Sequence, residues 1–295
     1  MRMNSLEDRV VDAVAIILVV AFAICCAYPF IYCFSLSFSG DEAILANSVK
    51  LLPKGFNFGS YKIVLGNTEF WTSLRNSVVL VVLGTLWQVS CTFALGYVLT
   101  RKDFVLYKPL SIFVLIPMFF GGGLIPHFLL IKSLKLYNTW GALILPAGVS
   151  IWNAMLVKSF VRNNIPSELI EASKIDGAND FQIFFRLIIP LSTTIIAIIS
   201  LYAAVGFWND YMDALIYLQD KGLKPLQLFL RNVLLKAGAL VEDSSLDPEA
   251  VLGAYIENTR IKYVLIVVAS MPIFIFYPFL QRYFVKGVML GSIKG

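Results

Sequence analysis

A cluster of aromatic, amide and acidic residues near position 210 has side chains of the kinds that bind sugars. It contains Trp208, Asn209, Asp210, Tyr211 and Asp213. Aromatic rings stack on sugar faces, while amides and carboxylates hydrogen-bond to sugar hydroxyls. Trp and Tyr are also enriched at membrane–water interfaces, where they only anchor a helix. The pattern therefore leaves a sugar site and an interfacial anchor as equal alternatives, and the two acids would suit an acidic sugar poorly unless a cation pairs with them.

Residues for catalysis or metal binding are sparse. His127 is the single histidine, and the four cysteines have the spacing of neither a zinc site nor a disulfide framework. No Gly-x-x-x-x-Gly-Lys-Ser/Thr phosphate loop occurs, so we do not expect this chain to hydrolyse ATP. We expect no catalytic residue, no metal site and no cofactor bound by the chain itself.

A few polar or helix-breaking residues lie in strongly apolar surroundings. Gly121–Gly123, flanked by Pro117 and Pro126, is expected to interrupt a helix. Such a break can expose the backbone at Gly122 to a transport path, although a kink that eases packing is the more favoured interpretation. Gln88 and Asn153 are interpreted first as residues that hold helices together, with a substrate contact at Asn153 as the alternative.

The composition places these residues in a membrane protein. Of the 295 residues, 58% are hydrophobic and 15% charged, and the mean hydropathy is +0.77, too apolar for an ordinary soluble domain. Six windows without a charged residue are 19 to 28 residues long, and about 20 apolar residues suffice for a spanning helix. We therefore predict an all-α protein of six transmembrane helices, with residues 1–295 forming one domain. The windows are 13–40, 76–100, 109–131, 136–157, 187–209 and 263–281.

Six spans place both termini on one side of the membrane. The total numbers of basic residues on the two sides are equal, but those directly beside helix ends favour cytoplasmic termini. They are Arg101, Lys102, Lys158, Arg162, Arg282 and Lys286. The segment 158–186 would then be cytoplasmic, and 210–262 would be the largest extracytoplasmic segment, with an acidic, solvated loop over 241–249.

The segment 158–186 contains strong local signals. Pro166 suits the start of a short helix and Gly177 suits the residue just past its end. Residues Asn179–Gln182 form a capping-box pattern that predicts a second helix running through Pro190 into the membrane. A short helix held at an angle to a membrane helix is a suitable docking element, although an ordinary amphipathic surface helix has the same cues.

This segment resembles the EAA loop of ABC importer permeases. The resemblance is carried by Glu171, Ala172 and Ser173, by Gly177 and by Leu187–Pro190, with Ser173 in place of the family's second alanine. Further stretches are similar to carbohydrate-importer permeases, among them 52–56, 76–77, 208–209, 225–227 and 284–288. The stretch Phe119–Pro126 is similar to a subgroup that includes permeases for alginate and pectin oligosaccharides.

The resemblance implies the type I importer permease fold and a function in the inner membrane. It implies an oligosaccharide importer that works by alternating access, with a second permease, two cytoplasmic ATPase subunits that hold ATP and Mg²⁺, and an extracytoplasmic binding protein. The segment 158–186 would contact the ATPases, and so would the C-terminal tail with Lys294 and Gly295. The candidate substrate path contains Gly122, Asn153, Trp208, Asn209 and Asp213.

Two other classes of function remain as alternatives. An ion-coupled secondary transporter needs ionisable residues inside its helices, and the six windows contain none except His127. A membrane-embedded enzyme needs a cluster of His, Cys and carboxylate residues, and no such cluster has a plausible spacing.

Overall fold

The computed structural model describes residues 6–242, 253 and 256–275, and these residues form helices joined by turns, with no strand among them. They divide into two compact units. Of the described residues, the first contains 6–70, 230–242, 253 and 256–272, and the second contains 71–229 and 273–275. Helix α4 (Thr68–Val98) and helix α14 (Leu226–Glu242) each begin in one unit and continue in the other.

Three helices are long and apolar enough to cross a membrane unbroken. They are Val10–Ser37, which lies within α1 (Leu6–Ser37), α4, and Ile256–Ile275. Three further pairs of helices pass the same test only as bent pairs, so the described residues contain six spans when each pair counts as one. The prediction of an all-helical membrane protein is therefore confirmed, but three of the six predicted spans are not continuous helices.

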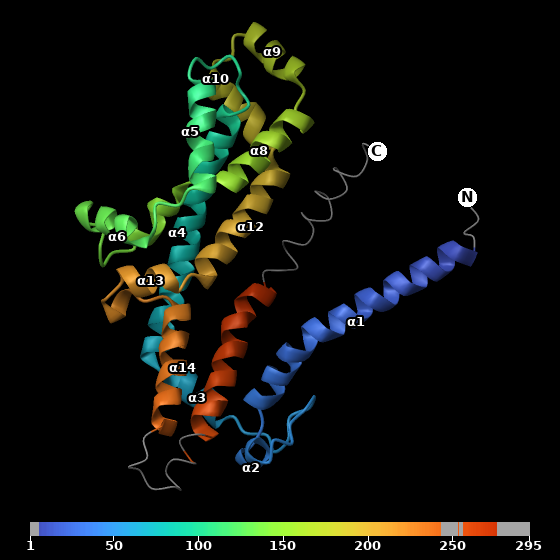
Figure 1. The fold of residues 1–295 in the computed structure, drawn as a ribbon, viewed down its shortest axis with the longest axis vertical. Helices are drawn as coiled ribbons and strands as arrows, with labels where there is room; N and C mark the ends of the chain where they lie inside the picture. Colours follow the sequence, from blue (N-terminus) through green and yellow to red (C-terminus); the bar gives the residue numbers. More distant parts are fainter. Residues whose placement is uncertain (1–5, 243–252, 254–255, 276–295) are drawn as a thin grey trace. The chain divides into compact units, whose positions relative to one another are not determined.

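The third span is broken at its glycines, as the sequence predicted. Helix α5 (Tyr107–Phe119) and helix α6 (Leu124–Ser133) meet at 118°, so the window 109–131 is not one straight helix. Gly123 has φ 81°, a conformation that glycine adopts without a steric penalty. Figure 1 shows α6 leaving the direction of α5.

The fifth predicted span is bent as well. A capping turn α10 (Asp180–Gln182), a π-helix (Ile183–Ile188) and α11 (Ile189–Leu191) precede α12 (Thr193–Asn209), and the two parts meet at 80°. The second helix of the loop runs through Pro190, as expected, but the sequence did not predict the bend of 80° between it and α12. The π-helix and Pro190 disturb the regular hydrogen-bond pattern of the helix. A window without charged residues identifies a segment in the membrane, but it does not show whether the chain bends within that segment.

The fourth span contains a break, and side chains of α4 donate hydrogen bonds to the backbone carbonyl groups at this break. Helix α7 (Gly141–Ile144) and the 3₁₀ turn Pro146–Gly148 meet α8 (Ile151–Asn164) at 40°. Trp87 Nε1 donates to the Leu145 carbonyl at 3.3 Å and Gln88 Nε2 donates to the Ala147 carbonyl at 2.7 Å.

Thr92 completes this arrangement. Its hydroxyl donates to the Gly148 carbonyl at 3.4 Å and accepts the Ser150 N–H at 3.0 Å. Irregular backbone at membrane depth needs such partners because lipid offers none. The interpretation of Gln88 as a residue that holds two helices together is confirmed.

Small residues let α4 approach its neighbours in the second unit. A Cβ atom at Gly96 would lie 2.6 Å from the Val157 side chain and 2.8 Å from the Ala154 carbonyl oxygen of α8. At Gly84 it would lie 2.5 Å from the ring of Phe207 on α12. Glycine therefore permits close helix contacts here, as is common between membrane helices.

Two buried apolar clusters complete the second unit. The first lies where α4, α8 and α12 meet the π-helix, and it contains Phe93, Tyr97, Val157, Val161, Ile165, Ile183, Ile188, Ile195 and Ile199. The second lies around α13 (Met212–Tyr217) and α7, and it contains Leu80, Ile131, Ala142, Leu143, Ala214, Tyr217, Leu218 and Leu228.

The beginning of the segment 210–262 is fixed to the second unit by side-chain hydrogen bonds. Asn76 Nδ2 donates to the carbonyls of Gly222 and Lys224 at 2.7 and 3.1 Å. Asn138 Oδ1 accepts the N–H groups of Gln219 and Asp220, both at 2.9 Å. The turn 218–224 therefore has a fixed conformation, which includes the 3₁₀ turn Lys221–Leu223.

The remainder of this segment differs from the expected acidic loop. Helix α14 extends through Glu242, so residues 241 and 242 are helical, while 243–252 lie outside the described residues. The start of α14 packs against the protein, because Leu226, Leu228, Phe229 and Leu230 are buried.

The first unit joins the end of α1 to α2 (Asp41–Leu45) and α3 (Gly59–Gly66). Buried serines in the last turn of α1 bond the chain that follows, and Arg260 on the helix Ile256–Ile275 forms an ion pair of 2.8 Å with Asp41. A cavity of about 580 Å³ lies between α2 and the turn around Lys54.

The contact at Gly96 gives a prediction for stability. We expect Gly96→Ala to destabilise the protein by about 1–3 kcal/mol, because the added methyl group would overlap a backbone carbonyl oxygen that cannot move freely. The measurement is the thermal unfolding temperature of the purified protein. Gly206→Ala on α12 is the control, because no atom lies within 4 Å of its added Cβ. Equal unfolding temperatures for the two variants would contradict the prediction.

Candidate coupling site

The short helix predicted in the segment 158–186 is present as α9 (Ser167–Ile175), and it ends in a Schellman motif. Gly177 has φ 82°, the Gly177 N–H donates to the Lys174 carbonyl at 3.0 Å, and the Ala178 N–H donates to the Ser173 carbonyl at 2.9 Å. Pro166 precedes the helix as its N-cap residue, one position earlier than expected. The left-handed conformation at Gly177 turns the chain sharply toward α10.

The predicted capping box at the start of α10 is also confirmed. The Asn179 side chain accepts the Gln182 N–H, and the Gln182 side chain accepts the Asn179 N–H, both at 2.9 Å. Two backbone donors at the helix start are thereby satisfied. The turn between α9 and α10 is consequently fixed at both of its ends.

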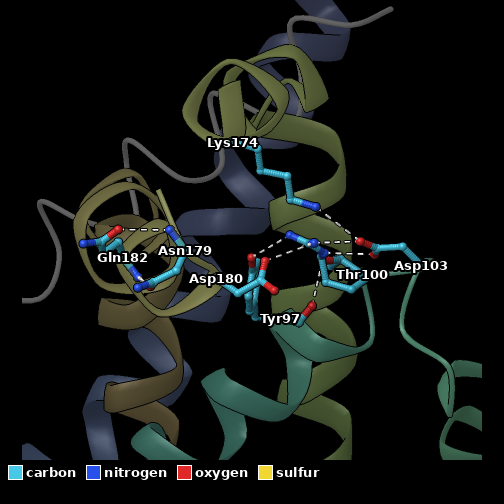
Figure 2. Close-up of polar contacts among 8 residues, drawn as sticks. Tyr97, Thr100, Asp103, Lys174, Asn179, Asp180 and Gln182 are labelled. Atoms are coloured by element: carbon cyan, nitrogen blue, oxygen red, sulfur yellow. Dashed lines mark hydrogen bonds and ion pairs between the residues drawn. The ribbon is translucent and has the colours of Figure 1, made fainter. Parts of the chain in front are cut away.

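Arg101, just beyond the end of α4, is the centre of a polar network that holds α9 and α10 (Figure 2). Its Nε and Nη2 atoms donate to the two carboxylate oxygens of Asp103 at 3.0 and 2.7 Å. Nη2 also donates to Asp180 Oδ1 at 3.3 Å, and Nη1 donates to the Tyr97 hydroxyl at 3.1 Å. Lys174 Nζ on α9 lies 3.5 Å from Asp103 Oδ2. We call Arg101, Asp103, Lys174 and Asp180 the arginine clasp.

Within the arginine clasp, Arg101 and Asp103 shift each other's pKa so that both favour the charged form. The hydrogen bonds from Arg101 lower the pKa of Asp103 to about 2, and the bonds to Asp103 raise the pKa of Arg101. A carboxylate whose folded-state pKa is lowered stabilises the fold above its unfolded-state pKa, and loses that effect as the pH falls through its folded-state pKa. For Asp103 this window runs from 3.8 down to about 2. The Arg101–Asp103 pair therefore remains charged throughout the physiological range.

Helix α9 has two distinct faces. Ile170 on α9 and Ala178, which follows the helix, pack against the first apolar cluster. Lys174 reaches Asp103 of the arginine clasp from the same side of α9. Glu171 and Ala172 are exposed. Ser173 is half-buried, and its hydroxyl donates to the Leu169 carbonyl at 2.8 Å, so it fills an alanine position without an unpaired polar group.

Large apolar side chains are exposed on this loop. Ile175 is 86% exposed and Phe181 is 78% exposed. Figure 1 shows α9 and α10 at one end of the second unit, beyond the ends of α5 and α8. An apolar surface on a rigid, projecting element has the properties of a docking site for another protein.

The candidate substrate-path residues lie outside this loop, and no hydrogen bond among the described residues joins one of them to another. Gly122 lies in the break between α5 and α6 with no atom within 4 Å of a built Cβ, and Asn153 is buried on α8. Trp208 is buried on α12, and its indole N–H has no partner among the described residues. The Asn209 side chain donates to the Val205 carbonyl, and Asp213 is exposed on α13. The tail residues 294 and 295 lie outside the described residues.

Comparison with known proteins gives the family. Residues 92–290 match the model of the family described as binding-protein-dependent transport system inner membrane component. The chain belongs to this family. A crystal structure of a bacterial ABC transporter involved in the import of the acidic polysaccharide alginate contains a chain that superposes with a TM-score of 0.84 at 29% identity, covering 96% of this chain and 100% of that one. The family resemblance expected from the loop is confirmed, and so is the placement of this permease in the inner membrane.

Three relatives align with nearly the full permease. It is 38% identical to the polygalacturonan/rhamnogalacturonan transport system permease protein YtcP of Bacillus subtilis strain 168, over 98% of this chain and 100% of that protein. It is 35% identical to the protein LplC of the same organism, over 99% of this chain and 97% of that protein. The melibiose/raffinose/stachyose import permease protein MelC of that organism is 26% identical, over 95% of this chain and 96% of that protein.

Two residues of the arginine clasp were missed from the sequence as parts of the site. Arg101 contributed only to the assignment of orientation, and Asp103 contributed nothing. A signal was present, because an arginine and an acid two residues apart directly follow a spanning helix. Their partners Lys174 and Asp180 are more than 70 residues away, so the pairing depends on the fold.

The arginine clasp gives a prediction for the dynamics of the loop. We expect Arg101→Gln to speed hydrogen exchange of the amides between 167 and 183 roughly tenfold, because hydrogen bonds to charged groups contribute about 1.5 kcal/mol or more and hold this loop closed. The measurement is hydrogen–deuterium exchange by mass spectrometry. Lys102→Gln is the matched control, since Lys102 is exposed and makes no polar contact within the described part of the chain. Exchange that is unchanged in Arg101→Gln would show that the clasp does not hold the loop.

Proposed function

We propose that this permease transports oligosaccharides across the inner membrane as the translocation subunit of an ATP-driven importer. The observation that carries the proposal is the loop containing α9 and α10, which presents Ile175 and Phe181 on a framework fixed by the arginine clasp. A rigid docking element can transmit a movement, whereas a flexible loop would absorb it. The transport of galacturonan and rhamnogalacturonan by YtcP supports a carbohydrate substrate.

The partners of this permease follow from the same assignment. A second permease chain, two ATPase subunits and an extracytoplasmic binding protein complete the importer. ATP and Mg²⁺ bind to the ATPase subunits, and this chain itself catalyses no reaction. Nothing in the comparisons favours the ion-coupled transporter, and the family match supports the ATP-driven class.

The proposed orientation places α9 in the cytoplasm and both termini on that same side. The basic residues beside this loop support it, because Lys and Arg accumulate at the cytoplasmic ends of spanning helices. Arg101, Lys102, Lys158 and Arg162 lie at the ends of α4 and α8 that are nearest to the loop.

The proposed substrate is an acidic plant or algal oligosaccharide, such as a uronate oligomer. The alginate importer and YtcP support this class. The substrate path would include Gly122, Asn153, Trp208 and Asn209, and also Asp213, which would need to pair with a cation to contact an acidic sugar. Trp208 is the strongest of these candidates, because a buried indole N–H normally has a hydrogen-bond partner and here has none among the described residues.

Copurification tests the proposed class of transporter. The tagged permease, expressed with its partner genes, is expected to retain a nucleotide-binding subunit in mild detergent. Reconstituted complexes should hydrolyse ATP faster when loaded binding protein is added. A permease that transports sugar without any nucleotide-binding subunit would contradict the proposal.

Two substitutions test the coupling role of the loop. We expect Glu171→Lys and Gly177→Asp each to abolish transport while the protein remains in the membrane. The first reverses an exposed charge on α9, and the second forces a residue with a Cβ into the conformation at φ 82°. Uptake of labelled oligosaccharide into proteoliposomes is the measurement. Gly66→Asp is the control for the second variant, because Gly66 has open space around it and no positive φ. Normal uptake in both coupling variants would reject the coupling role.

Trp208→Phe tests the substrate path. The substitution keeps an aromatic ring and removes the N–H, so we expect transport to be about 2- to 10-fold slower, equivalent to one net hydrogen bond of 0.5–1.5 kcal/mol. Trp152→Phe on the exposed face of α8 is the control. Equal rates for the two variants would remove Trp208 from the path.

A further inference from the structure

An exposed apolar turn follows the first spanning helix. Within residues 50–56, Leu51 is 55% exposed, Leu52 is 76% exposed and Phe56 is 70% exposed. Large apolar side chains that are exposed together normally indicate a surface that contacts something else. We call residues 50–56 the anchor turn.

A hydrogen bond fixes the depth of this turn relative to α1. The Ser35 hydroxyl donates to the Leu51 carbonyl at 2.7 Å, and Ser35 is 1% exposed. The span of α1 runs from Val10 to Ser37, and its 28 residues are about 42 Å long, which exceeds a hydrocarbon core of about 30 Å. Ser35 lies in the last turn of this span, where the excess length reaches beyond the core. That depth is the interfacial region of the bilayer, which extends several ångströms on either side of the core.

The anchor turn is held firmly at this depth. Ser39 Oγ accepts the Lys54 N–H at 3.2 Å, and the Gly40 N–H donates to the Lys54 carbonyl at 2.9 Å. A Cβ atom at Gly40 would lie 2.6 Å from the Gly55 carbonyl oxygen, so the backbone segments around Gly40 and Gly55 are in direct contact. Gly55 itself has φ 64°, which reverses the chain before Phe56. The exposed side chains therefore cannot fold back to bury themselves.

The charges near the turn suit a phospholipid surface. Residues 43–68 contain three lysines, Lys50, Lys54 and Lys62, and no acid. The two acids directly before this stretch, Asp41 and Glu42, line the same cavity as Lys54, and Asp41 forms an ion pair with Arg260. Two of these lysines lie within the anchor turn, beside its apolar residues. Lysine side chains can extend to lipid phosphates while leucine and phenylalanine enter the layer below.

We propose that the anchor turn inserts Leu51, Leu52 and Phe56 into the bilayer leaflet that α1 reaches at its C-terminal end. The turn thereby sets how far α1 can move along the membrane normal. Two observations favour lipid over a protein partner. The turn is bonded to the last turn of a spanning helix at interfacial depth, and it has a positive charge next to its apolar residues. The proposal does not depend on which substrate the permease carries.

Spin labelling at position 52 tests the proposal in the assembled importer, reconstituted in nanodiscs with anionic lipid. Cys25, Cys26, Cys33 and Cys91 are first replaced by alanine, and Leu52→Cys then carries a nitroxide. We expect oxygen, which partitions into lipid, to relax this label several-fold more effectively than a water-soluble nickel chelate. At Glu42→Cys, an exposed position on α2 and the matched control, the order should be reversed.

Either of two results would overturn the proposal. Nickel access at position 52 equal to that at position 42 would show that the turn is in water. Exclusion of both reagents from position 52 would show that a protein surface covers it. The measurement reads depth directly, so its outcome is separate from transport activity.

Discussion

The constraint that organises this permease is that hydrocarbon cannot satisfy a free backbone carbonyl or N–H group. Every departure from regular helix within the spans therefore needs a partner. At the break in the fourth span, Trp87, Gln88 and Thr92 supply it from α4. The break costs little because these three residues bond the carbonyls of Leu145, Ala147 and Gly148. Its position in the fold is consequently determined by α4 as much as by Pro146.

The same helix determines where the candidate coupling site lies. Arg101 directly follows α4 and bonds Asp180 at the start of α10, while Asp103 bonds Lys174 on α9. The apolar contacts of Ile170 place α9 against the cluster below it. Polar and apolar contacts thus act on the same side of α9 and leave the opposite side for a partner. This division explains how an exposed loop can be both rigid and apolar on its outer face.

Local features of the site were predictable, and features that depend on distant residues were not. Pro166, Gly177 and the pair Asn179 and Gln182 act on backbone within a few residues of themselves, so their patterns identified α9 and the capping box. The break at Gly121–Gly123 was predictable for the same reason, but its angle of 118° was not. The lack of charged residues located the fifth span but not its bend at Ser192. Hydropathy predicts whether a segment lies in lipid or in water, and it contains no information on the direction of the chain.

Helix α4 is also attached at its other end. Asn76 and Ser77 bond the turn 218–224 and the start of α14, and Arg101 bonds the coupling loop. The helix between the two attachments runs from Asn76 to Val98, which is about 33 Å. No proline interrupts α4 between them, and Gly84 and Gly96 are held by Phe207 and Val157. Helix α4 therefore joins the turn 218–224 to the loop containing α9 and α10 through one continuous helix, so a tilt of that loop would also move the turn.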